Sequence, residues 1–388
     1  MRIGKIKGRE ILDSRSNPTL EVELILDSGI KILASAPSGK STGTHEAKEL
    51  RDGDEHRYFG MGVLKAVENI NSLISDSLKG KDPANQSEID RTLIELDGTP
   101  DKSKLGANAT IATSIACLKA GALDNDIPLY KYIANIIENR NPLRIPTPMF
   151  NVINGGAHAD NNLHIQEYMI VPTDTDSFAQ RLCRASECYH RLKKSLENNG
   201  YSTTVGDEGG FAPNLPSDKY ALDLLEESDD IKIAFDFAGN LPPGWKFSEI
   251  SNNRKVISLE DPLGEDSWED WQKLTEEYGA RLMLVGDDLF STNIKRLQKG
   301  VKMGAGNAII IKPNQIGTIT ETFETIKYAR QNKYMIIASH RSGETEDTAI
   351  ADIAVGVGAN FIKSGAPARG ERIAKYNRLL RIEEELLS

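Results

Sequence analysis

The sequence contains few cysteines and few aromatic residues for its length. Cysteines occur at three of 388 positions, Cys117, Cys183 and Cys188, and aromatic residues make up 6% of the chain. The count is odd, and the spacing shows neither repeated Cys-x-x-Cys pairs nor a Cys/His zinc pattern, which argues against a disulfide framework or a structural zinc site. We expect small buried thiols in a reducing compartment.

Long apolar runs and an excess of positive charge are also absent. No run approaches the ~18 apolar residues of a membrane span, and residues 1–5 lack the apolar region of a signal peptide. Lys and Arg number 47 against 57 Asp and Glu, a formal net charge of -10. Because this field repels nucleic acid and anionic lipid, we expect neither as a partner. The missing signal peptide and membrane span lead us to expect a cytoplasmic protein. An anionic substrate would need a local patch of Lys, Arg or metal.

The composition is that of an ordinary globular protein, with 39% hydrophobic and 27% charged residues. Such a length predicts two or three domains of ~100–200 residues, or one barrel of ~250 residues with an addition. Proline-rich punctuation at 141–148 marks a change of pattern. We place the boundary there, with residues 1–138 as an N-terminal α+β capping domain and residues 139–388 as a catalytic α/β barrel.

The first part of the chain reads as strands followed by helices. Apolar and polar residues alternate over 20–26, which indicates a half-buried strand, and 30–36 continues the sheet after a turn. Residues 58–78 and 107–123 have the apolar spacing of helices, the second rich in small residues. This order is typical of an α+β unit.

The second part repeats one pattern, a short apolar run followed by a loop and a helical segment. Runs buried on both faces are typical of parallel strands. The runs are 165–171, 231–235, 256–259, 281–285, 308–311, 334–338 and 360–362. A polar residue follows the end of six of these runs, and successive polar residues are 23 to 28 positions apart. These residues are Asp236, Glu260, Asp287, Lys312, His340 and Lys363. The pattern predicts a closed α/β barrel with these side chains at its catalytic rim.

The strand-end residues divide into an acidic and a basic group. Taken singly, a carboxylate after a strand is more often a turn or helix-cap residue than a metal ligand. Asp236, Glu260 and Asp287 would nevertheless converge in a barrel, and a hard divalent cation such as Mg2+ would relieve their repulsion. Arg341 and Lys363 follow on later strands and suit an anion. The two halves together indicate a small acid with two negative groups.

Ten segments of the chain resemble, in order, the motifs of the enolase family, the glycolytic phosphopyruvate hydratases. These segments are Arg9–Arg15, Ser38–Gly43, Asn154–Ala159, Gln166–Met169, Gly206–Gly210, Ser258–Pro262, Gly286–Leu289, Asn314–Gly317, Ser339–Thr345 and Lys375–Glu383. The resemblance implies an N-terminal α+β lid domain followed by a modified (β/α)8 TIM barrel with an irregular start. It also implies a homodimer or larger homo-oligomer.

The resemblance assigns two Mg2+ ions to each active site. Asp236, Glu260 and Asp287 would hold the tightly bound ion, which chelates the substrate carboxylate. Ser41, on a loop of the first domain, would help to hold the second ion at the phosphate of the substrate.

The resemblance also assigns the reaction, the reversible dehydration of 2-phosphoglycerate to phosphoenolpyruvate. Lys312 would remove the proton at C2, and Glu208 would help the C3 hydroxide to leave. The implied substrate contacts are His158, Gln166, Glu167, His340, Arg341, Ser342 and Lys363. A base must be uncharged and an acid protonated, so we expect neighbouring cations to lower the pKa of Lys312 and Glu167 to raise the pKa of Glu208.

Three alternatives remain open at this point. Residues 34–41 nearly fit the phosphate-binding loop G-x-x-x-x-G-K-[ST], which would indicate a nucleotide hydrolase, although Gly43 and a turn at 52–54 leave little room for the required helix after Lys40. An enolase-like chain without activity could have a binding role. A sister enzyme could act on another acid, but the phosphate corner at 339–342 argues against that.

The chain departs from the family pattern at four places. Ser16 stands where the family usually has Gly, Lys40 where Ala is usual, and Gly370 where Ser is usual. The segment 238–253 is shorter than usual and lacks an Ala-Ser-Glu-Phe sequence. These departures bear on water exclusion and turnover more than on the type of reaction.

Overall fold

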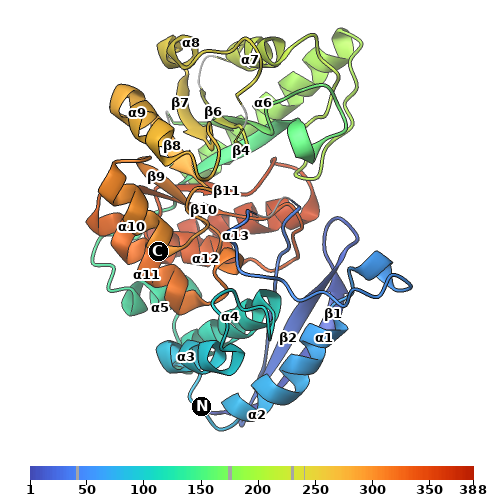
Figure 1. Ribbon diagram of the computed structural model, residues 1–388, viewed down its shortest axis with the longest axis vertical. Coiled ribbons are helices and arrows are strands. Elements are labelled where there is room, and N and C mark those ends of the chain that lie inside the picture. Colours follow the sequence, from blue (N-terminus) through green and yellow to red (C-terminus); the bar gives the residue numbers. More distant parts are fainter. Residues whose placement is uncertain (41–42, 174–176, 229–230, 240) are drawn as a thin grey trace.

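The computed structural model describes residues 1–40, 43–173, 177–228, 231–239 and 241–388. Its architecture is an N-terminal α+β domain followed by a closed eight-stranded α/β barrel, which confirms the predicted fold class. The two parts stack along the long axis of the molecule, with the first sheet and its helices below the barrel (Figure 1). Among the described residues, no helix has both the length and the apolar character needed to cross a bilayer.

The first domain is built on a three-stranded antiparallel sheet in the order β1-β2-β3. Its strands are β1 (Ile3–Leu12), β2 (Pro18–Leu26) and β3 (Lys31–Ser35). The alternation predicted for β2 holds, since Leu20, Val22 and Leu24 are fully buried. Helix α4 (Ala107–Asp124) packs on β2 and β3, and its many small residues allow a close approach. Helices α3 (Gln86–Asp97) and α5 (Leu129–Ile136) flank it.

The helical stretch predicted over 58–78 is confirmed for 64–78, where the helix is continuous with a π-helical middle, but not for 58–63, where a separate 3-10 turn precedes it. The elements are η1 (Tyr58–Gly60), α1 (Leu64–Asn69), the π-helical η2 (Ile70–Ile74) and α2 (Ser75–Leu78). Tyr58 and Phe59 have φ of 50° and 51°, values that no α-helix allows. The Asp52 carboxylate then accepts the N–H groups of Leu64 and Lys65 at 2.9 Å, so α1 begins there.

Eight strands close the barrel in the order β10-β11-β4-β5-β6-β7-β8-β9. The strands are β4 (Thr147–Asn154), β5 (Glu167–Val171), β6 (Lys232–Asp236), β7 (Val256–Glu260), β8 (Met283–Gly286), β9 (Ala308–Ile311), β10 (Met335–Ser339) and β11 (Phe361–Lys363). The surrounding helices are α6 (Phe178–Asn198), α7 (Asp218–Glu226), α8 (Phe247–Asn252), α9 (Trp268–Tyr278), α10 (Ile294–Met303), α11 (Ile319–Gln331), α12 (Ala349–Gly356) and α13 (Gly370–Leu387). Apolar side chains such as Met169, Val285 and Ile310 fill the interior, so the barrel is a packed core.

The barrel is not all parallel, contrary to the prediction for the run 165–171. Strand β5 is antiparallel to both β4 and β6. The connection between β4 and β5 carries only the short turn η3 (Gly156–His158), which is too short for a parallel crossover. As a result Glu167, the first residue of β5, pairs with Asp236, the last residue of β6. The reversed strand therefore starts at the rim where the parallel strands end.

Candidate active site

One cleft at the carboxyl rim of the barrel brings together eleven of the thirteen predicted site residues. The eleven are His158, Gln166, Glu167, Glu208, Asp236, Asp287, Lys312, His340, Arg341, Ser342 and Lys363. Glu260 lies behind them and contacts Lys363. Ser41 lies outside the described residues. The sequence argument did not single out Asp261 or Asp288, which also line the cleft, although each directly follows a predicted ligand.

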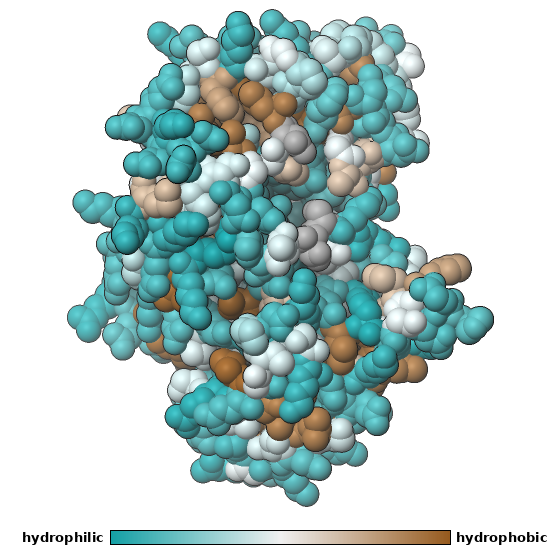
Figure 2. Space-filling model, viewed as in Figure 1, coloured by the Kyte–Doolittle hydropathy of each residue, from teal (hydrophilic) through white to brown (hydrophobic). Residues whose placement is uncertain are grey.

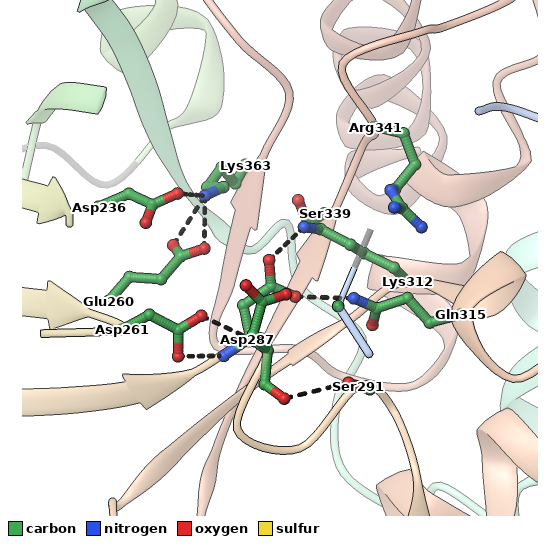
Figure 3. Close-up of polar contacts among 12 residues, drawn as sticks. Asp236, Glu260, Asp261, Asp287, Ser291, Lys312, Gln315, Ser339, Arg341 and Lys363 are labelled. Atoms are coloured by element: carbon green, nitrogen blue, oxygen red, sulfur yellow. Dashed lines mark hydrogen bonds and ion pairs between the residues drawn. The ribbon is translucent and has the colours of Figure 1, made fainter. Parts of the chain in front are cut away.

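The three predicted metal ligands lie at the ends of neighbouring strands and face two lysines (Figure 3). Asp236 and Glu260 are the last residues of β6 and β7, and Asp287 directly follows β8. Lys363 Nζ lies 2.7 and 2.8 Å from the two oxygens of Glu260 and 3.5 Å from Asp236 Oδ2. Lys312 Nζ donates a hydrogen bond to Asp287 Oδ2. All five side chains are largely buried, so these contacts form in a site with little water to screen them.

A second acidic group surrounds the end of β8. Carboxylate oxygens of Asp261, Asp287 and Asp288 lie within 4.8 Å of one another. The Asp261 carboxylate accepts the backbone N–H of Asp287 at 3.1 Å and of Asp288 at 2.7 Å. Asp261 therefore braces the turn that carries a predicted ligand.

The acidic half holds more carboxylate charge than its lysines neutralise. Burial and the neighbouring Asp236 raise the pKa of Glu260 to about 8. Burial and Asp287 raise the pKa of Asp288 to about 7, and burial also raises the pKa of Asp261. A divalent cation would supply the missing positive charge, and carboxylate oxygens are the ligands that Mg2+ prefers. The residues present thus fit a bound Mg2+.

The structure contradicts the expected direction for Lys312. Burial lowers the pKa of this lysine, but the Asp287 carboxylate in contact with it outweighs burial and raises the pKa. The cations that the sequence argument invoked are Mg2+ and Lys363. Lys363 lowers the pKa of Lys312 as expected, as does Arg341, but both effects are weaker than that of the direct ion pair.

Two glutamates and two histidines form the other wall of the cleft. His158 Nδ1 lies 3.4 Å from Glu208 Oε1 and 3.8 Å from Glu167 Oε1. Asn151 donates to Glu208 Oε2 at 2.9 Å, and His340 Nε2 lies 3.4 Å from the same oxygen. Both glutamates are 2% exposed. Charge on one glutamate therefore strongly affects the other.

The prediction that Glu167 raises the pKa of Glu208 is wrong in this arrangement. Burial raises the pKa of Glu208, but His158 and His340 outweigh it and hold the pKa well below its usual range. Burial and the charge of Glu208 instead raise the pKa of Glu167 far above its usual range. The pKa values of the two carboxyl groups are thus shifted in opposite directions.

The basic corner is organised by a residue that the sequence argument did not assign to the site, Arg372. This fully buried guanidinium donates to the carbonyl oxygens of Arg341 and Ser342, each at 2.6 Å. It also lies 2.8 Å from His340 Nδ1. Because arginine only donates, Nδ1 must accept, which leaves the proton of His340 on Nε2 facing Glu208. Burial lowers the pKa of His340 to about 4, so the ring is neutral.

A loop of the first domain lies over the basic corner. The N–H groups of Ser38 and Gly343 donate to each other's carbonyl oxygens at 2.7 and 2.9 Å. Lys40 donates its backbone N–H to Ser342 Oγ at 2.8 Å and its ammonium to Asp207 Oδ2 at 2.8 Å. The described residues 43–57 form no helix. A phosphate-binding loop requires a helix there, so the nucleotide hydrolase alternative loses its structural support.

Two departures from the family pattern have a place in the structure. Ser16 has φ of 60°, a left-handed conformation that glycine adopts without strain. Gly370 begins α13, where an added Cβ would meet no atom within 4 Å. Neither position lies in the cleft.

Comparison with protein families gives two matches that together cover most of the chain. The family model described as "Enolase, C-terminal TIM barrel domain" matches residues 142–240 and 245–388. The model described as "Enolase, N-terminal domain" matches residues 3–133. The unmatched residues 241–244 fall within the segment 238–253 that departs from the family pattern.

Proposed function

The chain belongs to the enolase family of lyases, and we propose from this premise that it catalyses the Mg2+-dependent, reversible dehydration of 2-phosphoglycerate to phosphoenolpyruvate. One observation supports this most: Lys312 and Glu208 lie in the same cleft as a carboxylate-rich half and an arginine corner. Those are the groups needed to move a proton from one carbon and release hydroxide from the next.

In the proposed reaction Lys312 takes the proton from C2, and it must be uncharged to do so. Its ion pair with Asp287 raises its pKa, and Asp287 is one of the carboxylates that would bind Mg2+ instead, which would release the lysine from that ion pair. The electron pair left behind forms the C2–C3 double bond, the C3–O bond breaks, and the departing hydroxide takes a proton to leave as water. We assign the delivery of that proton to Glu208. Because the pKa of Glu208 is low, Glu208 would first take the proton from Glu167, whose pKa is raised and whose carboxylate lies within 4.8 Å. Lys363, buried among Glu167, Asp236 and Glu260, would face the substrate carboxylate.

The metal ligands in the proposal are Asp236, Glu260 and Asp287 for one Mg2+, with Ser41 contributing to a second. Bound Mg2+ would supply the positive charge that offsets the extra negative charge of the substrate after C2 loses its proton. Arg341, Ser342 and His340 would hold the phosphate end, and His158 and Gln166 would contact the reacting carbons. Tight packing of these groups would exclude water.

The test is an assay of phosphoenolpyruvate formation by the purified protein with Mg2+ and with a chelator. We expect turnover with Mg2+ and none with the chelator. Binding of 2-phosphoglycerate without turnover at saturating Mg2+ would instead favour a binding role, and turnover of a different acid would favour a sister reaction of the same type.

We also propose that the chain forms a homodimer or larger homo-oligomer. The first domain carries a patch of exposed apolar side chains, since Leu12 and Leu33 line one hollow and are 54% and 46% exposed. Phe59, in η1 of the same domain, is 88% exposed. Figure 2 shows a surface that is otherwise largely hydrophilic, with hydrophobic atoms on the loop that projects from the first domain. A second copy could cover this patch. Sedimentation at several concentrations would show whether Phe59→Ser weakens association.

A further inference from the structure

The carboxylate of Glu46 joins the first domain to the basic corner of the barrel. Glu46 is 6% exposed and Arg341 is 4% exposed. Arg341 Nη1 donates to Glu46 Oε2 at 2.9 Å, and Nη2 donates to Oε1 at 3.2 Å. The two residues are far apart in the sequence, so this forked ion pair exists only when the first domain sits on the barrel.

The fork leaves part of the guanidinium available. A guanidinium presents its N–H groups along two edges. Glu46 takes the outer edge formed by the two Nη atoms, and Asn314 Oδ1 accepts a further bond from Nη1 at 3.0 Å. Within the described part of the chain, no residue accepts a hydrogen bond from Nε. The edge formed by Nε and Nη2 therefore has donors for two oxygens of an anion.

A second contact connects Glu46 to the acidic half. Gln315, 1% exposed, places Nε2 at 2.9 Å from Asp287 Oδ1 and at 3.4 Å from Glu46 Oε1. Thr292 Oγ1 donates to Gln315 Oε1 at 2.7 Å, which fixes the end of the amide that faces the acids. Figure 3 shows Gln315 and Lys312 reaching Asp287 from the same side. The amide thus joins the first-domain carboxylate to a predicted metal ligand.

We propose that Glu46 is a positioning residue: it holds Arg341 with its free edge toward the substrate phosphate and, through Gln315, couples that edge to Asp287. The inference rests on the proposed function for the identity of the anion, a phosphate ester. Through Glu46, the first domain would help to form the anion site of the barrel.

The change in phosphate affinity when Glu46 loses its charge distinguishes three possible roles of this residue. If Glu46 only neutralised Arg341, removing its charge would strengthen the binding of phosphate, because an opposing negative charge is gone. If Glu46 only held the domains together, the variant would lose stability with no change in phosphate affinity. If Glu46 positions Arg341, phosphate binding weakens, because an amide donates where the fork needs an acceptor.

The experiment compares the parent with Glu46→Gln and Glu46→Asp, using inorganic phosphate as the probe with Mg2+ present. Titration calorimetry gives its dissociation constant, and competition with 2-phosphoglycerate gives its inhibition constant. We expect Glu46→Gln to weaken phosphate binding about tenfold, equivalent to ~1.4 kcal/mol, and to raise KM by a similar factor with a smaller change in kcat. Calorimetric titration of Mg2+ alone should show weaker binding in this variant.

The matched control is Asp352→Asn, which removes another buried carboxylate from an arginine fork. Asp352 is 3% exposed and accepts Arg378 Nε at 2.9 Å and Nη2 at 2.7 Å, between α12 and α13. It lies outside the cleft. The Asp352→Asn variant should bind phosphate with the same affinity as the parent, even if it is less stable.

Unchanged or tighter phosphate binding by Glu46→Gln overturns the proposal. If circular dichroism shows that Glu46→Gln does not fold, Glu46→Asp provides the test. Its carboxylate keeps the charge but is one methylene shorter, so we expect it to bind phosphate more weakly than the parent. Equal binding overturns the proposal. A parent that binds phosphate but does not dehydrate 2-phosphoglycerate refutes the proposed function alone. An active parent with an unaffected Glu46→Gln refutes only the role of Glu46.

Discussion

The acidic and basic halves of the cleft differ in how their charges are compensated. In the basic corner the protein supplies its own partners: Arg341 has Glu46, Lys375 has Glu344 at 2.7 Å, and Arg372 has backbone carbonyls. In the acidic half, Glu260 and Asp288 have raised pKa values even with Lys312 and Lys363 in place. The buried cations of the basic corner thus have protein partners, whereas the acidic half carries more carboxylates than its two lysines neutralise.

The largest effect on this comparison should come from Lys312→Ala, which removes the base and a cation from the acidic half. Exchange of the C2 proton with solvent should fall about 1000-fold, in the range for loss of a general base. Deuterium incorporation into 2-phosphoglycerate, followed by NMR, measures it. A control is Lys119→Ala, whose ammonium pairs with Asp347 at 2.7 Å outside the cleft. Substantial exchange in Lys312→Ala would show that another group is the base.

The next effect separates the two glutamates. Glu208→Gln should lose water elimination by about 100-fold or more while retaining C2 exchange, because proton removal precedes departure of the hydroxide. Glu167→Gln should lose less, since a neutral amide resembles the protonated form that burial favours at Glu167. Exchange and elimination measured in parallel would reveal swapped roles if Glu167→Gln were the more damaging change.

A smaller effect concerns the brace under the acidic half. Asp261→Asn should weaken Mg2+ binding by ~10–100-fold, the usual cost of losing a group that orients a metal ligand. The carboxylate of Asp261 holds the N–H groups of both Asp287 and Asp288. Adding Mg2+ should raise the unfolding temperature of the parent. At a Mg2+ concentration 100 times the dissociation constant, the gain in the free energy of unfolding should be about 2.7 kcal/mol. An unchanged Mg2+ titration in the variant would contradict the bracing role.

The smallest effect should come from the loop over the basic corner. Lys40→Ala removes the ion pair between Lys40 and Asp207. The Lys40 side chain is 41% exposed, and ion pairs at the surface contribute only ~0–1 kcal/mol to stability. Turnover of 2-phosphoglycerate should stay within about tenfold of the parent, or ~1.4 kcal/mol in the barrier. Ser41→Ala should be more damaging. Tight ATP binding by the parent that Lys40→Ala abolishes would restore the nucleotide hydrolase reading.

The sequence predicted the positions of the catalytic strands well, because buried parallel strands leave a strong apolar signal with a polar residue at the end. Asp236 and Glu260 end β6 and β7, and Lys363 ends β11. It did not predict the direction of β5, since an apolar run carries no information on which way its neighbours run. Strand β4 was missed for another reason, because Pro148 lies within it and argues against a strand.

The residues that support the site were harder to find than those that line it. Arg372 acts through backbone carbonyls, which leave no trace in the sequence. Glu46 and Gln315 depend on how one domain sits on the other. The opposite pKa shifts of Glu167 and Glu208 depend on burial and on which donors surround each carboxylate, a property of packing. Pattern alone therefore gives the groups that react, and only the fold gives their protonation.

The paired hydrogen bonds between Ser38 and Gly343 have a consequence for the order of assembly. They join the start of the chain to a segment near its end, where an added Cβ at Gly343 would lie 2.4 Å from Asp13 and Ser38 side chains. During synthesis, at ~5–20 residues per second, the first domain emerges well before residue 343. Ser38 therefore cannot form its two hydrogen bonds with Gly343 until most of the barrel has been synthesised. The cleft is therefore among the last parts of the molecule to form.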